Sequence, residues 1–362
     1  MRRLFPVFAG AMCLAVSASA EMRLASIFTD HMVLAAGRPV RVFGTGEGRA
    51  TVTLNGVTVM ALTSEGGWCA TLPALAVGGP YEMSVELDGS KRVLSDVRVG
   101  EVLLLAGQSN MQFMLRESTS DPKTWTGNPN IRMFSTTRLE SGGPYTAKDG
   151  WVVLDRGSAG KWSAIGYETA VRLAKEKNCA VGLVNCFQGA SVIQAWLPRR
   201  LALEPRFVLP ADKCDQSEFR PNRYSLWNRA GTLYERQFGE IVPYSVSAVL
   251  WYQGEANSGS VAEGRMYADL LETLIGQWRI DLGDCRLPFV VIELASEKTT
   301  VNSADAWNAV RHSQREVAER CPFVTCVRTD DICEADKGIH PPTKWKIGER
   351  VAATLAEKGK GR

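Results

Sequence analysis

Residues 102–111, with the sequence VLLLAGQSNM, decide the fold of this 362-residue chain. A short apolar run that ends at a glycine is typical of a buried strand, and the polar residues after Gly107 indicate a turn into a helix. Similar apolar runs follow along the chain, at 180–185, 246–252, 289–294 and 323–327. Helical patterns separate these runs, and strands that alternate with helices predict a parallel sheet with helices on both faces.

The intervening helices are amphipathic. Between residues 265 and 278, apolar side chains recur three and four positions apart, and 305–318 and 344–358 show the same spacing. This periodicity places the apolar residues on one face of each helix, where they can pack against the sheet.

The amino-terminal quarter of the chain has a different pattern. Residues 21 to about 98 alternate apolar and polar side chains in short runs, and glycine-rich turns such as Asn55-Gly56 and Asp88-Gly89 separate the runs. We therefore predict a small β-sandwich-like domain over 21–98 and an α/β domain over 99–362.

The first twenty residues have the three parts of a signal peptide. Arg2 and Arg3 precede a mostly apolar run, and Ala18-Ser19-Ala20 provides a small-residue cleavage site. The apolar run is shorter than the about 20 residues that a spanning helix needs. These features predict a secreted or periplasmic protein without a membrane span.

Composition argues against several classes of ligand. The formal net charge is +3 and no basic block is present, which argues against nucleic acid or an anionic membrane as a partner. Three histidines make a zinc site improbable, and no metal or organic cofactor is expected. Eight cysteines follow the leader, an even number that permits disulfides in an exported protein, although buried free thiols explain them equally well.

Ligands of an open parallel sheet bind beyond the carboxyl ends of its strands, and four polar segments of this chain lie at such ends. Ser109 follows the first α/β strand, on a tight turn that would expose its hydroxyl as a nucleophile. Gly189 follows the next strand, where its unhindered N–H could bind an oxyanion. Each has a plainer explanation, since serines often begin helices and glycines often form turns.

The other two segments lie later in the chain. Gln253, in Trp251-Tyr252-Gln253-Gly254-Glu255, could donate an amide N–H to the same oxyanion, and Glu255 could contact a histidine. His340 lies in a loop before the last helix, and an imidazole with a pKa near about 6.5 suits a general base. Trp196 and Trp251 are interpreted either as sugar contacts or as core aromatics.

Together these segments resemble the SGNH hydrolases and, within them, the sialate O-acetylesterase family of carbohydrate esterases. The resemblance rests on GQSNM at 107–111, WYQGE at 251–255, and His340-Pro341 with Lys344. It implies a flavodoxin-like sheet, Ser109 as nucleophile, His340 as base, and an oxyanion hole formed by Ser109, Gly189 and Gln253.

One departure concerns the acid that orients the histidine. Many SGNH enzymes have an aspartate three residues before it, whereas this chain has Lys337 there. Glu255 is our first candidate for this acid and Asp336 our second, and a Ser–His dyad is the third reading.

The predicted activity is hydrolysis of acetyl esters on carbohydrates through an acyl-enzyme on Ser109. Three alternatives remain at this point: a lipase-like esterase, an acyltransferase, and a non-catalytic carbohydrate-binding protein. The sequence does not distinguish among acetylated sugars and indicates no protein partner.

Overall fold

The computed structural model describes residues 22–139, 150–209, 226–296, 303–333 and 338–359. The predicted signal peptide, Cys214 and Asp336 lie outside these ranges. Among the described residues no helix is both long enough and apolar enough to cross a bilayer. No two of the seven cysteines that the structure describes are joined by a disulfide.

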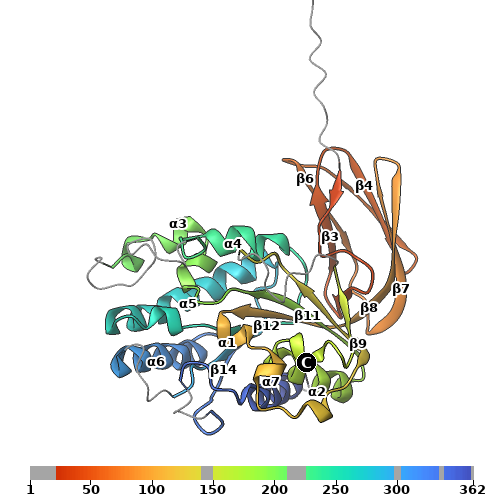
Figure 1. Cartoon of the computed structure of the whole chain (residues 1–362). Helices are drawn as coiled ribbons and strands as arrows, with labels where there is room; N and C mark the ends of the chain where they lie inside the picture. Colours follow the sequence, from red (N-terminus) through yellow and green to blue (C-terminus); the bar gives the residue numbers. More distant parts are fainter. Residues whose placement is uncertain (1–21, 140–149, 210–225, 297–302, 334–337, 360–362) are drawn as a thin grey trace, which may run out of the picture.

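The centre of the molecule is a mixed sheet with helices packed against it (Figure 1). Its path runs β10-β9-β11-β8-β12-β13-β14, and every neighbouring pair from β9 to β14 is parallel. The bounds are β8 Ser90–Gly107, β9 Asn128–Ser135, β10 Val152–Leu154, β11 Ala180–Phe187, β12 Ala248–Tyr252, β13 Phe289–Ile292 and β14 Val324–Val327. The apolar runs of the sequence therefore predicted β8, β11, β12, β13 and β14, whereas β9 and β10 were not predicted.

Strand register determines where the polar loops lie. Gly107, the last residue of β8, pairs with Phe187 of β11 on one side and with Tyr252 of β12 on the other. These three parallel strands therefore end level with one another, and the segments that follow them start at the same edge of the sheet. Ser109, Gly189 and Gln253 each lie within two residues of these strand ends.

The long helices pack in pairs. Helix α2 (Ala164–Lys177) packs against α7 (Lys344–Gly359), and α5 (Val261–Asp281) packs against α6 (Ala304–Arg320). The predicted face of α5 is buried, with its apolar side chains at Tyr267, Leu270, Leu271, Leu274, Ile275 and Trp278. Their burial confirms the helical spacing read from the sequence.

Several short elements connect the long ones. The short α-helices are α1 Ser109–Gln112, α3 Arg199–Ala202 and α4 Thr232–Arg236. The 3₁₀ helices are η1 Leu115–Glu117, η2 Pro122–Thr124, η3 Ala159–Lys161, η4 Ile193–Trp196, η5 Pro205–Phe207, η6 Phe238–Glu240 and η7 Glu255–Asn257.

The amino-terminal strands gather at one end of the molecule, red to orange in Figure 1. They are β1 Arg23–Leu24, β2 Val33–Ala35, β3 Val40–Thr45, β4 Arg49–Leu54, β5 Val57–Leu62, β6 Gly67–Leu72 and β7 Gly78–Leu87. Strands β1, β3 and β6 form a separate sheet, whereas β4, β5 and β7 join the large sheet through β8. The 18-residue strand β8 runs straight through the predicted domain boundary at residues 98 and 99.

Candidate active site

Ser109 and His340 meet although 231 positions separate them in the sequence. The Ser109 Oγ and His340 Nε2 atoms are 2.7 Å apart, within hydrogen-bond distance. Ser109 is the first residue of α1 and lies directly beyond β8, whereas His340 precedes α7. The sheet edge therefore brings together the two side chains that proton transfer requires.

The turn before Ser109 depends on a glycine. Gly107 has a φ of +126°, and a Cβ there would lie 2.1 Å from the Tyr252 carbonyl oxygen of β12. Only glycine fits both this backbone conformation and this close approach of two strands. The strand–glycine–serine order thus aims Ser109 out of the sheet.

Gly189 lies beside the same serine. A Cβ placed on Gly189 would be 3.9 Å from the Ser109 Cβ, so its backbone passes close to the hydroxyl. Ser109 itself occupies the first position of α1, where a backbone N–H has no intrahelical acceptor. The backbone at these two residues can therefore present N–H donors on one side of the Ser109 hydroxyl.

Glu255 reaches the histidine loop through Asn110. The Asn110 side-chain amide donates to Glu255 Oε1 and, at 2.8 Å, to the carbonyl oxygen of Ile339. Ile339 immediately precedes His340. Glu255 and Asn110 are both buried, with 5% and 2% of their surfaces exposed, so this bridge is shielded from water.

Lys344 contacts the residue that follows His340. Its ammonium group, fully buried, donates to the carbonyl oxygen of Pro341 and lies over the rings of Phe113, at 5.2 Å, and Tyr252, at 5.8 Å. Asn110 thus binds the carbonyl of the residue before His340, and Lys344 binds the carbonyl of the residue after it, so the loop is restrained on both sides of the imidazole.

These surroundings favour a neutral imidazole. Burial lowers the pKa of His340 below its ordinary value, and the Lys344 charge lowers it further, while Glu117 opposes both. Burial also raises the pKa of Glu255 to about 7, against the opposing effects of the Asn110 hydrogen bond and of Lys344. The lowered pKa favours neutral His340, which is the form that can accept a proton from Ser109.

Gln253 lies below the surface. It is fully buried, and its amide nitrogen donates to the Ser191 carbonyl oxygen and to Asn257 Oδ1, both at 2.9 Å. Its carbonyl oxygen accepts from the Tyr267 hydroxyl at 2.9 Å. The two acceptors use both amide hydrogens, so this conformation does not supply the predicted oxyanion donor.

The two tryptophans considered as sugar contacts belong to the core. Trp196 and Trp251 are fully buried, and their ring centroids lie 6.3 Å apart at an interplanar angle of 86°. This edge-to-face arrangement is typical of packed aromatic interiors and leaves neither ring accessible to a ligand.

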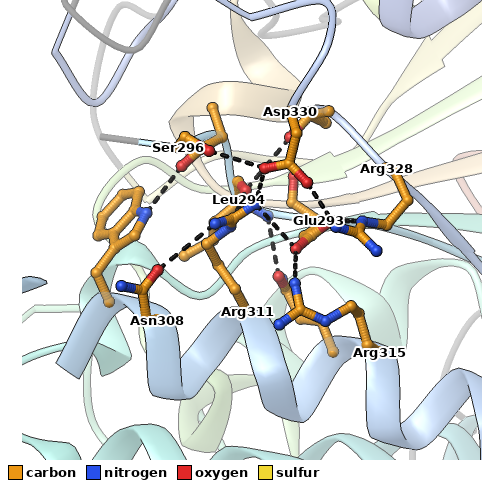
Figure 2. Close-up of polar contacts among 12 residues, drawn as sticks. Glu293, Leu294, Ser296, Asn308, Arg311, Arg315, Arg328 and Asp330 are labelled. Carbon is orange, nitrogen blue, oxygen red and sulfur yellow. Dashed lines mark hydrogen bonds and ion pairs between the residues drawn. The ribbon is translucent and has the colours of Figure 1, made fainter. Parts of the chain in front are cut away.

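A cluster of ion pairs around the buried carboxylate of Glu293 anchors the segment that leads to His340. Figure 2 shows the carboxylate of Glu293, which is fully buried, among the guanidinium groups of Arg311, Arg315 and Arg328. Asp330 pairs with Arg311 and Arg328 on the other side of the cluster. The cluster joins helix α6 to the chain that follows β14.

A second set of contacts connects the same segment of chain to helix α7. The two carboxylate oxygens of Asp331 each accept from Arg350 of α7 at 2.7 Å, and Arg350 also donates to the Arg328 carbonyl oxygen at 2.7 Å. Residues 328–331 are thus tied to two helices before the chain reaches His340.

Comparison with known proteins agrees with this geometry. Residues 99–357 match the family model described as "Carbohydrate esterase, sialic acid-specific acetylesterase". The chain belongs to this family of carbohydrate esterases. The match contains Ser109, Gly189, Gln253, Glu255 and His340, and it starts within β8, after the amino-terminal strands.

Individual relatives of the carbohydrate esterase extend the similarity to the amino-terminal strands. The rat sialate O-acetylesterase is 25% identical over 91% of this chain and 72% of its own length. The human sialate O-acetylesterase is 25% identical over 92% of this chain and 70% of its own. The crystal structure of a carbohydrate acetylesterase from Xanthomonas citri superposes with a TM-score of 0.77 at 27% identity, covering 94% of this chain and 76% of that one.

Sequence reasoning missed the roles of Asn110 and Lys344 in this carbohydrate esterase. Both lie in segments that carried the resemblance, next to Ser109 and four residues after His340. Their closeness in sequence to Ser109 and His340 was the only indication of these roles that the sequence offered. The structure adds that their side chains bind the carbonyls of Ile339 and Pro341. No group of three or more potential metal ligands occurs in the described part of the chain.

Proposed function

We propose that this protein is a serine esterase that removes acetyl groups from carbohydrates. The observation that carries the proposal is the 2.7 Å contact between Ser109 Oγ and His340 Nε2 at the carboxyl edge of the sheet. A hydroxyl and a neutral imidazole at this distance form the nucleophile–base pair of acyl transfer. Family membership supports acetylated sugars as the class of substrate.

In the proposed reaction, His340 takes the Ser109 proton as Oγ attacks the acetyl carbonyl carbon. The negative charge that develops on the carbonyl oxygen is stabilised by the backbone N–H groups of Ser109 and Gly189. His340 then protonates the departing sugar alcohol and leaves an acetyl ester on Ser109. A water that gives its proton to His340 releases acetate and restores the serine.

The orientation of His340 is assigned to its neighbours along the backbone. Asn110 and Lys344 bind the carbonyl oxygens on either side of it, and Glu255 accepts a hydrogen bond from the Asn110 amide. Glu255 thus acts through Asn110 in this proposal. Asp336 remains the alternative acid for orienting His340. The third interpretation is a Ser109–His340 dyad without an orienting acid.

The same proposal includes the division of the chain into domains and its cellular location. Residues 99–362 would form an SGNH-type, flavodoxin-like hydrolase domain, supported by the parallel strands and by the positions of Ser109 and His340. Residues 21–98 would form the β-domain, supported by its separate sheet. Residues 1–20 would direct the protein to the periplasm or the exterior.

The direct test is Ser109→Ala in an assay of acetate release from p-nitrophenyl acetate and from acetylated sugars. We expect a loss of about 10³-fold or more in kcat with an unchanged circular dichroism spectrum. Ser90→Ala, at an exposed position, is the matched control. Unchanged turnover in Ser109→Ala would remove the nucleophile assignment.

Two further measurements separate the neighbouring activities. A series of p-nitrophenyl esters of increasing acyl length should show turnover falling sharply beyond acetate, whereas a lipase-like enzyme would keep or increase it. Adding an acceptor sugar should leave acetate as the product, whereas an acyltransferase would acylate the acceptor. A protein that only binds carbohydrate would release nothing.

A further inference from the structure

A cavity lies beside the loop that carries His340. It has a volume of about 440 Å³ and is bordered by α2, α7 and the segment around η2, with α2 and α7 side by side in Figure 1. We call it the α2–α7 pocket. Its lining includes Thr119, Asp121, Thr126, Tyr167, Arg172 and Trp345. The volume lies within the about 300–1,000 Å³ of small-molecule sites.

The pocket lining combines aromatic surface with hydrogen-bonding groups. Trp345 is half-buried, and Tyr167 is buried at the pocket floor with its hydroxyl accepting from the Thr126 N–H at 2.9 Å. Asp121 uses one carboxylate oxygen to accept from the Lys123 N–H. A pyranose ring presents C–H groups on its faces and hydroxyls at its edges, and it matches a wall of this kind.

The pocket is coupled to the active-site loop. The Thr119 backbone N–H donates to the Pro342 carbonyl oxygen at 3.1 Å, two residues after His340. The Trp345 Nε1–H donates to the Thr119 hydroxyl oxygen at 3.1 Å, so the hydroxyl hydrogen of Thr119 remains available to a ligand. One short segment, 340–345, therefore carries the catalytic imidazole at one end and the pocket's indole at the other.

The charges of the side chains that line the pocket favour a neutral sugar over an anionic one. Among the described residues that line the pocket, Arg172 is the only cation, and it already pairs with Glu168, at 2.7 Å, and with Glu349. Asp121 adds a further negative charge to the wall. A sugar carboxylate would find no uncompensated positive charge among these lining groups to pair with. A neutral sugar needs no such ion pair, so its binding is not weakened by this arrangement of charges.

We propose that the α2–α7 pocket binds a neutral sugar unit of an acetylated oligosaccharide while another unit presents its acetyl ester to Ser109. This inference rests on the proposed esterase function and specifies its substrate as a glycan chain. Binding at the pocket would raise affinity for longer chains and leave the chemical step on small esters untouched.

The test compares Trp345→Ala with wild type on partially acetylated xylotetraose and on p-nitrophenyl acetate. We expect KM for the tetrasaccharide to rise about tenfold, as for loss of an aromatic anchor. The kinetics with p-nitrophenyl acetate should stay within about twofold of wild type, and Trp345→Phe should restore most of the tetrasaccharide affinity. Phe323→Ala, which removes another exposed ring, is the control.

Binding without turnover separates this inference from the esterase proposal. Unacetylated xylotetraose should bind to Ser109→Ala in calorimetry, and adding Trp345→Ala should abolish the binding. Sialyllactose should bind at least tenfold more weakly than xylotetraose. Equal xylotetraose binding with and without Trp345, an unchanged KM in Trp345→Ala, or preferred binding of sialyllactose would each overturn the assignment, whatever the outcome for Ser109.

Discussion

Replacing Glu255 by glutamine should change how the stability of the fold depends on pH. Burial raises the pKa of this carboxyl from 4.5 to about 7. An acid with a raised pKa in the folded state resists ionisation there but ionises readily when the chain unfolds. Its contribution to stability is therefore fully present below pH 4.5 and is lost as the pH rises towards 7.

The size of the effect follows from the two pKa values. One pKa unit corresponds to about 1.4 kcal/mol, so the full difference between pKa 4.5 and about 7 is worth about 3 kcal/mol. Part of it is already lost at pH 5, which leaves about 2.5 kcal/mol between pH 5 and pH 8. Glutamine has nearly the same shape, can still accept from Asn110 through its carbonyl oxygen, and does not titrate.

Urea unfolding at pH 5 and pH 8 measures the effect for wild type and Glu255→Gln. Other titrating groups are common to both proteins, so the difference between their two pH dependences isolates Glu255. We expect wild type to lose about 2.5 kcal/mol more than the variant over this interval. Parallel pH dependences would show that Glu255 titrates normally and that the buried bridge to Asn110 is wrongly described.

Three other changes have definite expected outcomes. Lys344→Met removes a positive charge that lowers the pKa of His340, so the acidic limb of the kcat/KM profile should move to higher pH; an unmoved limb would exclude this electrostatic role. Glu293→Gln removes the buried carboxylate that Arg311, Arg315 and Arg328 share and should cost about 3 kcal/mol in urea unfolding, whereas the exposed Glu319→Gln should cost little. Gly107→Ala would force a Cβ to 2.1 Å from a β12 carbonyl oxygen, so we expect loss of soluble protein or of most esterase activity, and wild-type activity would refute the described turn.

Much of the fold could be read from local patterns. Apolar runs predicted the parallel strands β8, β11, β12, β13 and β14 but not β9, and helical spacing predicted the buried face of α5, because burial of one face imposes a period on neighbouring residues. Glycine and serine after β8 predicted the exposed turn, because strand-to-helix turns have strict backbone requirements. These are properties of residues close together in the chain.

The sequence did not show how distant side chains share hydrogen bonds. Gln253 was predicted to face the substrate, but Ser191 and Asn257 bind its amide inside the protein. A motif shows which groups follow a strand, whereas the direction of each side chain depends on neighbours contributed by other strands.

The sequence by itself determined five of the parallel strands, the helices α5, α6 and α7, and the polar residues at the strand ends. The tertiary structure alone decided that Ser109 and His340 touch, that Asn110 and Lys344 hold the loop around the imidazole, and that Thr119 and Trp345 border a pocket behind it. The reason is that periodicity records burial along one segment, whereas these contacts join segments up to 231 residues apart and depend on strand register and packing.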